Sequence, residues 1–177
     1  MIDDDTHTKR LFFALDINVQ CKQQLSTWLN THVQIHKAPT QCRNWHLTLC
    51  FLGEINASVE AQIVQHAERI RTAPFSVTLD EHDYWQHNGL FHLKPSHPPA
   101  QLFDLAAQLQ TLANDLAIPT QHHSYKPHVT LARSLKQRPI IMAKPPRISI
   151  EANTYTLFHS TRDQHGLVYQ ALKQFAL

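Results

Sequence analysis

The sequence predicts an α+β fold, from the order of its elements and from a strand motif that occurs once in each half. Segments with strand-like alternation and segments with helical spacing follow as strand, helix, strand, helix, hairpin, helix and several closing strands. The motif is His-x-Thr between apolar neighbours, at residues 46–48 and again at residues 128–130. A motif strand in each half indicates two similar lobes that face one another.

In the first half of the chain, two predicted strands alternate with two predicted helices. Asn18 precedes the first helix and Asn56 or Ser58 the second, where a side-chain oxygen can accept a hydrogen bond from a free backbone N–H. Gly53 follows the motif strand and is expected to end it. The predicted elements are a buried strand at residues 10–17, a helix from Asn18 to about His32, the motif strand at residues 44–52, and a helix to about Arg71.

The second half contains the clearest local signal, Asn88-Gly89 between two short apolar runs. This dipeptide predicts a hairpin with a type I′ turn over residues 84–94. Pro98-Pro99 opens a helix with a leucine stripe that reaches about Leu116. The other predicted elements are strands at residues 75–79, 127–134 (the second motif), 148–152, 154–159 and 167–173, with a basic connection at residues 136–147 and a turn at residues 163–166.

Composition indicates a small globular protein of the cytoplasm. The 177 residues are enough for one core, so a single domain over residues 1–177 is expected. No apolar run is long enough to span a membrane, and the first ten residues are polar and acidic, unlike a signal peptide. Cys21, Cys42 and Cys50 are odd in number and lack C-x-x-C spacing, which is typical of reduced thiols.

Charge and histidine content restrict the kinds of ligand. A net charge of +2 means that any polyanion must be held by a local patch rather than by the whole surface. The 14 histidines form no H-E-x-x-H motif. Four of them recur every five residues, at positions 82, 87, 92 and 97, which fits neither a helix face nor a strand face. No metal site is therefore predicted.

The two His-x-Thr motifs place an imidazole and a hydroxyl side by side on a rigid element. Strand side chains alternate, so His46 and Thr48 share one face, as do His128 and Thr130. Two facing imidazoles can supply a general base and a general acid, and two hydroxyls can hold phosphate oxygens. The spacing alone is weak evidence, because a third His-x-Thr begins at His159 and runs into a polar turn. The alternative is two half-buried pairs that make cross-strand hydrogen bonds.

The residues around the motifs resemble a known family over nearly the whole chain. The segments that carry the resemblance are RLFFALDI, RNWHLTLCFLGEI, YWQHNGLFHLKP, YKPHVTLARS and GLVYQALKQFAL. They are similar to RNA 2′,3′-cyclic phosphodiesterase, the branch of the two-histidine phosphoesterase superfamily also called 2′-5′ RNA ligase. The resemblance implies a bilobal α+β fold, in which each lobe is an antiparallel sheet with helices outside and the central cleft carries both motifs.

The resemblance also implies an activity and roles for named residues. RNA ends or nucleotides with a 2′,3′-cyclic phosphate would be hydrolysed to 2′-phosphates without a metal or other cofactor, alongside a reversible 2′-5′ RNA ligation. His46 would be the acid and His128 the base, although residue types alone allow the reverse. Thr48 and Thr130 would bind the phosphoryl oxygens. The expected protein is a monomer without a membrane partner.

Two further candidates depend on local geometry. Arg133 lies three residues after Thr130, so a regular strand would turn it away from the phosphate, and only a bulge or a strand end would bring it inward. A surface arginine is the alternative. Phe51 is a candidate platform for base stacking, or a core phenylalanine. Arg43 and Lys126 flank the motifs and are weaker candidates. Other functions left open are hydrolysis of small cyclic nucleotides or 2′-5′ oligonucleotides, and a non-catalytic RNA-end-binding module.

Overall fold

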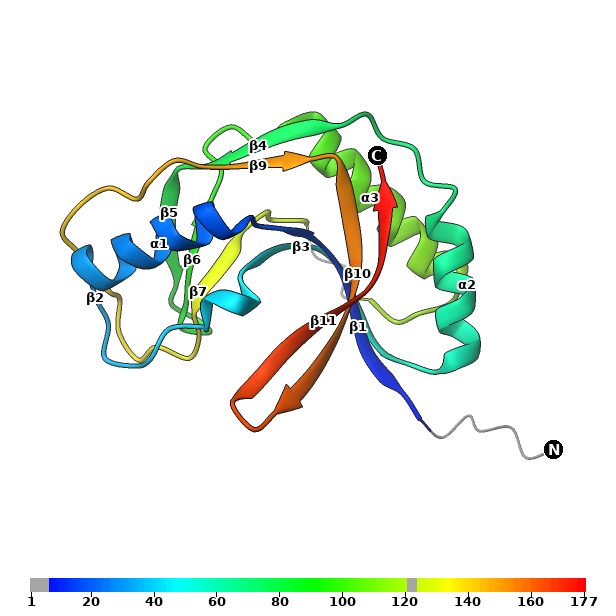
Figure 1. The fold of residues 1–177 in the computed structure, drawn as a ribbon, viewed down its shortest axis with the longest axis horizontal. Coiled ribbons are helices and arrows are strands. Elements are labelled where there is room, and N and C mark those ends of the chain that lie inside the picture. The colour runs from blue at the N-terminus through cyan, green and yellow to red at the C-terminus, as the bar shows by residue number, and fades with distance from the viewer. Residues whose placement is uncertain (1–6, 121–123) are drawn as a thin grey trace.

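The computed structural model describes residues 7–120 and 124–177 (Figure 1). The helices are α1 (Val19–His32), α2 (Ala57–Ala67), α3 (Ala100–Asp115) and the short 3-10 helix η1 (Cys42–Asn44). The strands are β1 (Lys9–Asp16), β2 (Val33–Gln34), β3 (His46–Ile55), β4 (Phe75–Leu79), β5 (Glu81–Trp85), β6 (Leu90–Lys94), β7 (Val129–Ala132), β8 (Ile140–Ile141), β9 (Ile148–Ala152), β10 (Thr154–Asp163) and β11 (Gly166–Ala176).

One curved antiparallel sheet runs through the molecule in the order β11-β10-β1-β3-β7-β6-β5. The two expected sheets meet where β3 lies beside β7, and a single residue pair, Leu47 with Val129, links them. Two small sheets, β2-β8 and β4-β9, complete the described strands. The α+β class with two antiparallel halves and outer helices is confirmed.

The helices and the functional motifs use different faces of the sheet. In Figure 1, α1 lies beside β5–β7, while α2 and α3 lie beside the other half. Along β1, Leu11 and Phe13 are fully buried in the main core toward the helices. Phe12 and Ala14 point the other way and form a small separate cluster with Phe158. This second face carries the site.

Two local predictions are wrong, each for a conformational reason. Gly53 does not end the motif strand, because its φ of 79° allows β3 to continue to Ile55. The 84–94 hairpin is present, but its turn spans residues 86–89 between Trp85 and Leu90 instead of two residues. A type I′ turn needs positive φ at both central residues, and in this turn only Gly89 has it.

The predicted helix starts are confirmed at both caps, with Asn18 accepting from Cys21 N and Asn56 from Val59 N. The second motif strand is shorter than expected and begins at Val129, so His128 immediately precedes it. β10 and β11 are longer than expected and form a hairpin that reaches back to η1. Its tip is held there by Arg43, which makes two hydrogen bonds to Asp163 of 2.8 and 3.2 Å.

The cysteines, the clusters of possible metal ligands and the helices bear on the expectations from composition. Cys21, Cys42 and Cys50 are free thiols, and only Cys50 is buried. Among the described residues, no group of three or more His, Cys, Asp or Glu side chains is placed to hold a metal ion. None of the helices in residues 7–120 and 124–177 combines the length and the hydropathy needed to cross a membrane.

Candidate active site

The central residues of the two motifs pair with each other across β3 and β7. Leu47 and Val129 are directly opposite and fully buried, so the His and Thr on either side of each point to the other face. Because the strands are antiparallel, His46 is the neighbour of Thr130 across the two strands, and Thr48 is the neighbour of His128. One register pair thus places both histidines and both threonines around the same space.

Each motif histidine is held by the backbone carbonyl two residues before it. Nδ1 of His46 is 2.7 Å from the carbonyl oxygen of Asn44, and Nδ1 of His128 is 2.7 Å from that of Lys126. A carbonyl oxygen only accepts hydrogen bonds, so the contacts assign the proton to Nδ1 in both rings. Nε2 of each ring then carries the lone pair and is the atom that can take or give a proton.

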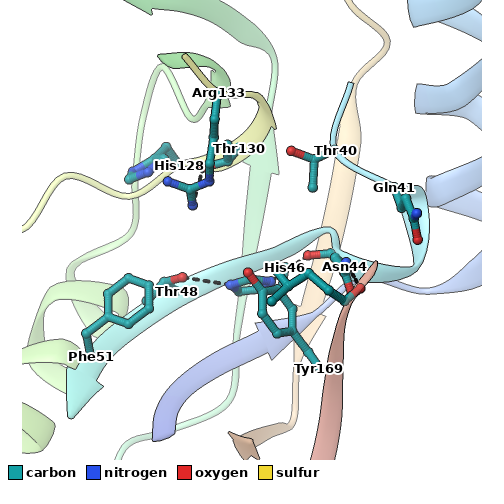
Figure 2. Close-up of a pocket in the computed structure, with 11 residues that line it drawn as sticks. Thr40, Gln41, Asn44, His46, Thr48, Phe51, His128, Thr130, Arg133 and Tyr169 are labelled. Carbon is teal, nitrogen blue, oxygen red and sulfur yellow. Dashed lines mark hydrogen bonds between the residues drawn. The ribbon is translucent and has the colours of Figure 1, made fainter. Parts of the chain in front are cut away.

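The hydroxyls and the guanidinium belong to the same constellation (Figure 2). Oγ1 of Thr48 is 2.8 Å from Nε2 of His46, and Nη2 of Arg133 donates a long hydrogen bond of 3.4 Å to Oγ1 of Thr130. β7 ends at Ala132, so Arg133 is free of the strand alternation and turns toward Thr130. Of the two ways in which Arg133 could point inward, a bulge or a strand end, the structure has the strand end.

These side chains line a pocket of about 260 Å³. Phe51 stands at its edge with 52% of its surface exposed, so it is not a core residue. All six predicted site residues are in the lining. The full set is Thr40, Gln41, Asn44, His46, Thr48, Phe51, His128, Thr130, Arg133, Leu167 and Tyr169. The two weaker candidates are elsewhere: Arg43 is paired with Asp163, and Lys126 lies over the ring of Trp85.

The two histidines have different neighbours. The ring of His46 is 4.8 Å from Phe12 and 4.8 Å from Tyr169, which meets it edge-on at 85°. The ring of His128 is 4.8 Å from Trp85 and 5.3 Å from His92. Sequence reasoning missed Tyr169, because nothing near it marks a site and the β10–β11 hairpin brings it from 123 residues away.

Burial keeps both motif histidines neutral in the free protein. It lowers the pKa of His46 to about 4, and the positive charge of Arg133 acts in the same direction. Burial and Arg133 also lower the pKa of His128 below its ordinary value. A phosphate anion in the pocket would favour the charged imidazolium and raise both pKa values. The arrangement therefore suits an anionic ligand whose arrival recruits a proton.

Two residues outside the motifs make contacts that support the site, Tyr125 between the two halves and Asn44 within the half that contains β3 and β11. The hydroxyl of Tyr125 donates a 2.9 Å hydrogen bond to the backbone carbonyl of Thr48, across the junction of the two halves. The side-chain amide of Asn44 donates a 2.8 Å hydrogen bond to the carbonyl of Leu167 on β11, while its own carbonyl holds His46. Asn44 thereby connects the hairpin to the first histidine.

The third His-x-Thr of the sequence is not part of the site. His159 on β10 lies opposite Leu11, which points into the main core, whereas its neighbour Phe158 belongs to the pocket-side cluster. His159 thus occupies the other face of the sheet. Strand alternation separates it from the pocket although its local sequence matches the motif spacing.

Comparison with known proteins places this geometry in a family. The model of the 2′-5′ RNA ligase superfamily matches residues 23–157, which include both motifs. The chain belongs to the 2′-5′ RNA ligase superfamily. Over 170 residues it is 32% identical to RNA 2′,3′-cyclic phosphodiesterase of Escherichia coli (strain K12), with 96% of this chain and 97% of the relative covered. The resemblance read from the sequence is confirmed.

Two further relatives of this superfamily extend the likeness. RNA 2′,3′-cyclic phosphodiesterase of Thermotoga maritima is 27% identical over 183 residues, covering 92% of each chain. The crystal structure of Escherichia coli LigT complexed with 3′-AMP superposes with a TM-score of 0.91 at 31% identity, covering 97% of this chain and 99% of that one. The fold around the motifs is therefore that of solved members of the superfamily.

His92 provides a stability test of the buried environment behind His128. It is 1% exposed, its Nε2 has no hydrogen-bond partner among the described residues, and burial lowers its pKa from 6.5 to about 4. Below pH 6.5 the unfolded chain binds a proton that the folded chain does not, so stability falls as pH falls from 6.5 to about 4. Replacing His92→Phe should reduce this loss by about 1–3 kcal/mol.

Urea denaturation of wild type and His92→Phe at pH 7.5 and pH 4.5 measures the difference. The carboxylates remote from position 92 contribute equally to both proteins, so the comparison isolates His92 together with Asp83, whose pKa the charge of His92 lowers. An equal loss of stability in the two proteins would contradict the assignment of His92 as a buried neutral group.

Proposed function

We propose that the protein hydrolyses RNA 2′,3′-cyclic phosphate ends to 2′-phosphates without a metal. The observation that carries the proposal is the facing pair of motifs, with Nε2 of His46 and of His128 both available at one pocket. Two curated relatives named RNA 2′,3′-cyclic phosphodiesterase support it. LigT, the E. coli relative, was crystallised with 3′-AMP, which supports a nucleotide ligand.

The reaction opens a strained five-membered phosphodiester by attack of water at phosphorus. One neutral imidazole takes a proton from the water, and one imidazolium gives a proton to O3′ as the P–O3′ bond breaks. The hydroxyls of Thr48 and Thr130 donate to the non-bridging oxygens, and the guanidinium of Arg133 offsets the charge that develops there. The product keeps the phosphate on O2′.

We assign His46 as the acid and His128 as the base. Phosphorus lies between them, so the leaving O3′ faces one histidine and the attacking water faces the other. His46 is neutral when the pocket is empty, and the bound phosphodiester anion supplies the negative charge that stabilises its imidazolium. Burial lowers the pKa of His128 in the free protein, so its ring is neutral and in the form that can accept a proton from water.

The same geometry accommodates a second nucleophile. A 5′-hydroxyl of another RNA in the place of water would give a 2′-5′ phosphodiester, and the superfamily's name supports this reversible ligation.

We further propose that residues 1–177 act as one bilobal domain and as a monomer, since one chain supplies both motifs and the whole pocket lining. Three free thiols favour the cytoplasm.

The decisive experiment is turnover of an RNA oligonucleotide with a 2′,3′-cyclic end in excess EDTA. The product should be the 2′-phosphate, which is identified by its resistance to a 3′-specific phosphatase. Binding without turnover would instead indicate an RNA-end-binding module. Turnover of cyclic mononucleotides or 2′-5′ oligonucleotides but not of the RNA end would indicate the alternative substrates.

Replacing either motif histidine should abolish most turnover. His46→Ala and His128→Ala each remove one proton transfer, and we expect kcat to fall by about 10²–10⁴-fold. The double variant should be little worse than either single one, because the two side chains act as a unit. His159→Ala, from the motif copy on the other face, is the control and should keep wild-type kcat. Near-normal kcat in either single variant would refute the mechanism.

Arg133 should set the pH dependence. Removing its positive charge by Arg133→Gln raises the pKa of both histidines, so the bell of kcat/KM should move to higher pH while its height falls. Arg133→Lys keeps the charge and should leave the position of the bell unchanged. Steady-state kinetics from pH 4 to pH 10 measure this. A rate that rises monotonically to pH 10 would point to a metal-bound hydroxide instead.

A 3′-thio cyclic phosphate tests the two roles separately. A thiolate leaves with little protonation, so His46→Ala should lose much less activity on this substrate than on the oxygen substrate. His128→Ala should remain severely impaired on both, because the water still needs a base. Rescue of His128→Ala in place of His46→Ala would reverse the assignment.

A further inference from the structure

An aromatic layer extends from His46 along the pocket-side face of the sheet. Phe12 on β1 lies 4.8 Å from His46, 5.6 Å from Phe51 and 4.8 Å from Tyr169, measured between ring centroids. Phe12 is 1% exposed because these rings cover it, whereas Phe51 is half exposed at the pocket edge. In Figure 2, Tyr169 lies against His46, and Phe51 lies beyond Thr48 on the same strand.

Arg10 is the next side chain on this face. It lies two residues before Phe12 on β1, roughly 7 Å further along the strand and pointing the same way. Its neighbour Lys9 points to the helix side, where it pairs with Glu60 of α2 at 2.9 Å. Arg10 lies opposite Ser160 of β10, and Ser160 lies opposite Tyr169 of β11, so the three form one row across the sheet.

The guanidinium of Arg10 is available to a ligand. Arg10 is exposed and makes no ion pair or side-chain hydrogen bond with another described residue. The carboxylate opposite it on β3, Glu54, accepts a 3.0 Å hydrogen bond from Thr8. The positive charges of Arg10 and Arg133 both act to lower the pKa of the Tyr169 phenol against the larger effect of burial, which places both within electrostatic reach of that ring.

We propose that Arg10 binds the phosphodiester on the 5′ side of the cyclic end, so that the substrate is an RNA strand rather than a free cyclic mononucleotide. This inference rests on the proposed function and deepens it. With the cyclic phosphate between the two histidines, the terminal nucleoside lies over the aromatic layer, where Phe51 and Tyr169 offer stacking surfaces. The next phosphate then reaches Arg10, which suits it as a bidentate donor. A cyclic mononucleotide has only a 5′-hydroxyl there.

The test compares three substrates that end in the same 2′,3′-cyclic nucleotide. The first is the mononucleotide, the second a dinucleotide with a phosphodiester linkage, and the third the same dinucleotide with an uncharged methylphosphonate linkage. Wild type should show a roughly tenfold higher kcat/KM on the charged dinucleotide than on the other two. Arg10→Gln should lose that advantage and keep the wild-type rate on the mononucleotide, which also shows that it is folded.

Arg69→Gln is the matched control, because Arg69 is an exposed arginine just beyond α2 and its loss changes net charge equally. It should behave as wild type on all three substrates. The salt dependence of kcat/KM for the charged dinucleotide should weaken by about one counterion in Arg10→Gln alone.

Two results would overturn the inference while leaving the proposed function intact. One is equal wild-type turnover of the charged and methylphosphonate dinucleotides, and the other is an equal loss on all substrates in Arg10→Gln. Wild-type turnover of none of the three would instead refute the proposed function itself.

Discussion

The pairing of Leu47 with Val129 is the contact on which the site depends. It is the one register pair between β3 and β7, and it lies at the centre of both motifs. A shift of one residue in this register would reverse the faces and bury the histidines and threonines of one motif in the core. Full burial of the two apolar side chains opposes such a shift, so hydrophobic packing on one face fixes the positions of the motif histidines and threonines on the other.

Burial and nearby charge together set the protonation state of the two motif histidines. Burial and a neighbouring guanidinium make protonation of both histidines unfavourable in the free protein. A phosphate anion in the pocket would act in the opposite direction. The two motifs have the same residue pattern, but their histidines have different neighbours. His46 packs against Phe12 and Tyr169, whereas His128 packs against Trp85 and the buried His92. The acid and base roles that we propose can differ because of these neighbours, although the motifs themselves are alike.

The strands and the motif faces could be predicted because they depend on local periodicity. Alternation placed His46 and Thr48 on one face, and the helix caps at Asn18 and Asn56 follow from side-chain hydrogen bonding to nearby N–H groups. Arg133 could not be oriented, because that depends on where β7 ends. Tyr169 and His92 were not predicted to lie beside the motif histidines, because only tertiary packing brings them there. The prediction that Gly53 ends its strand was wrong because a residue with positive φ can bend a strand without ending it.

The position of β1 between β3 and β10 has a consequence for how the protein forms. Arg10 pairs with Ser160, so a contact between neighbouring strands of the large sheet closes a loop of nearly the whole chain. Contacts between residues so distant in sequence cost loop-closure entropy before their interaction energy is gained, and proteins with such topologies fold slowly. During synthesis on a ribosome, His46 emerges long before the hairpin that carries Tyr169. The nascent chain therefore holds both motif histidines while one wall of the pocket has not yet been made.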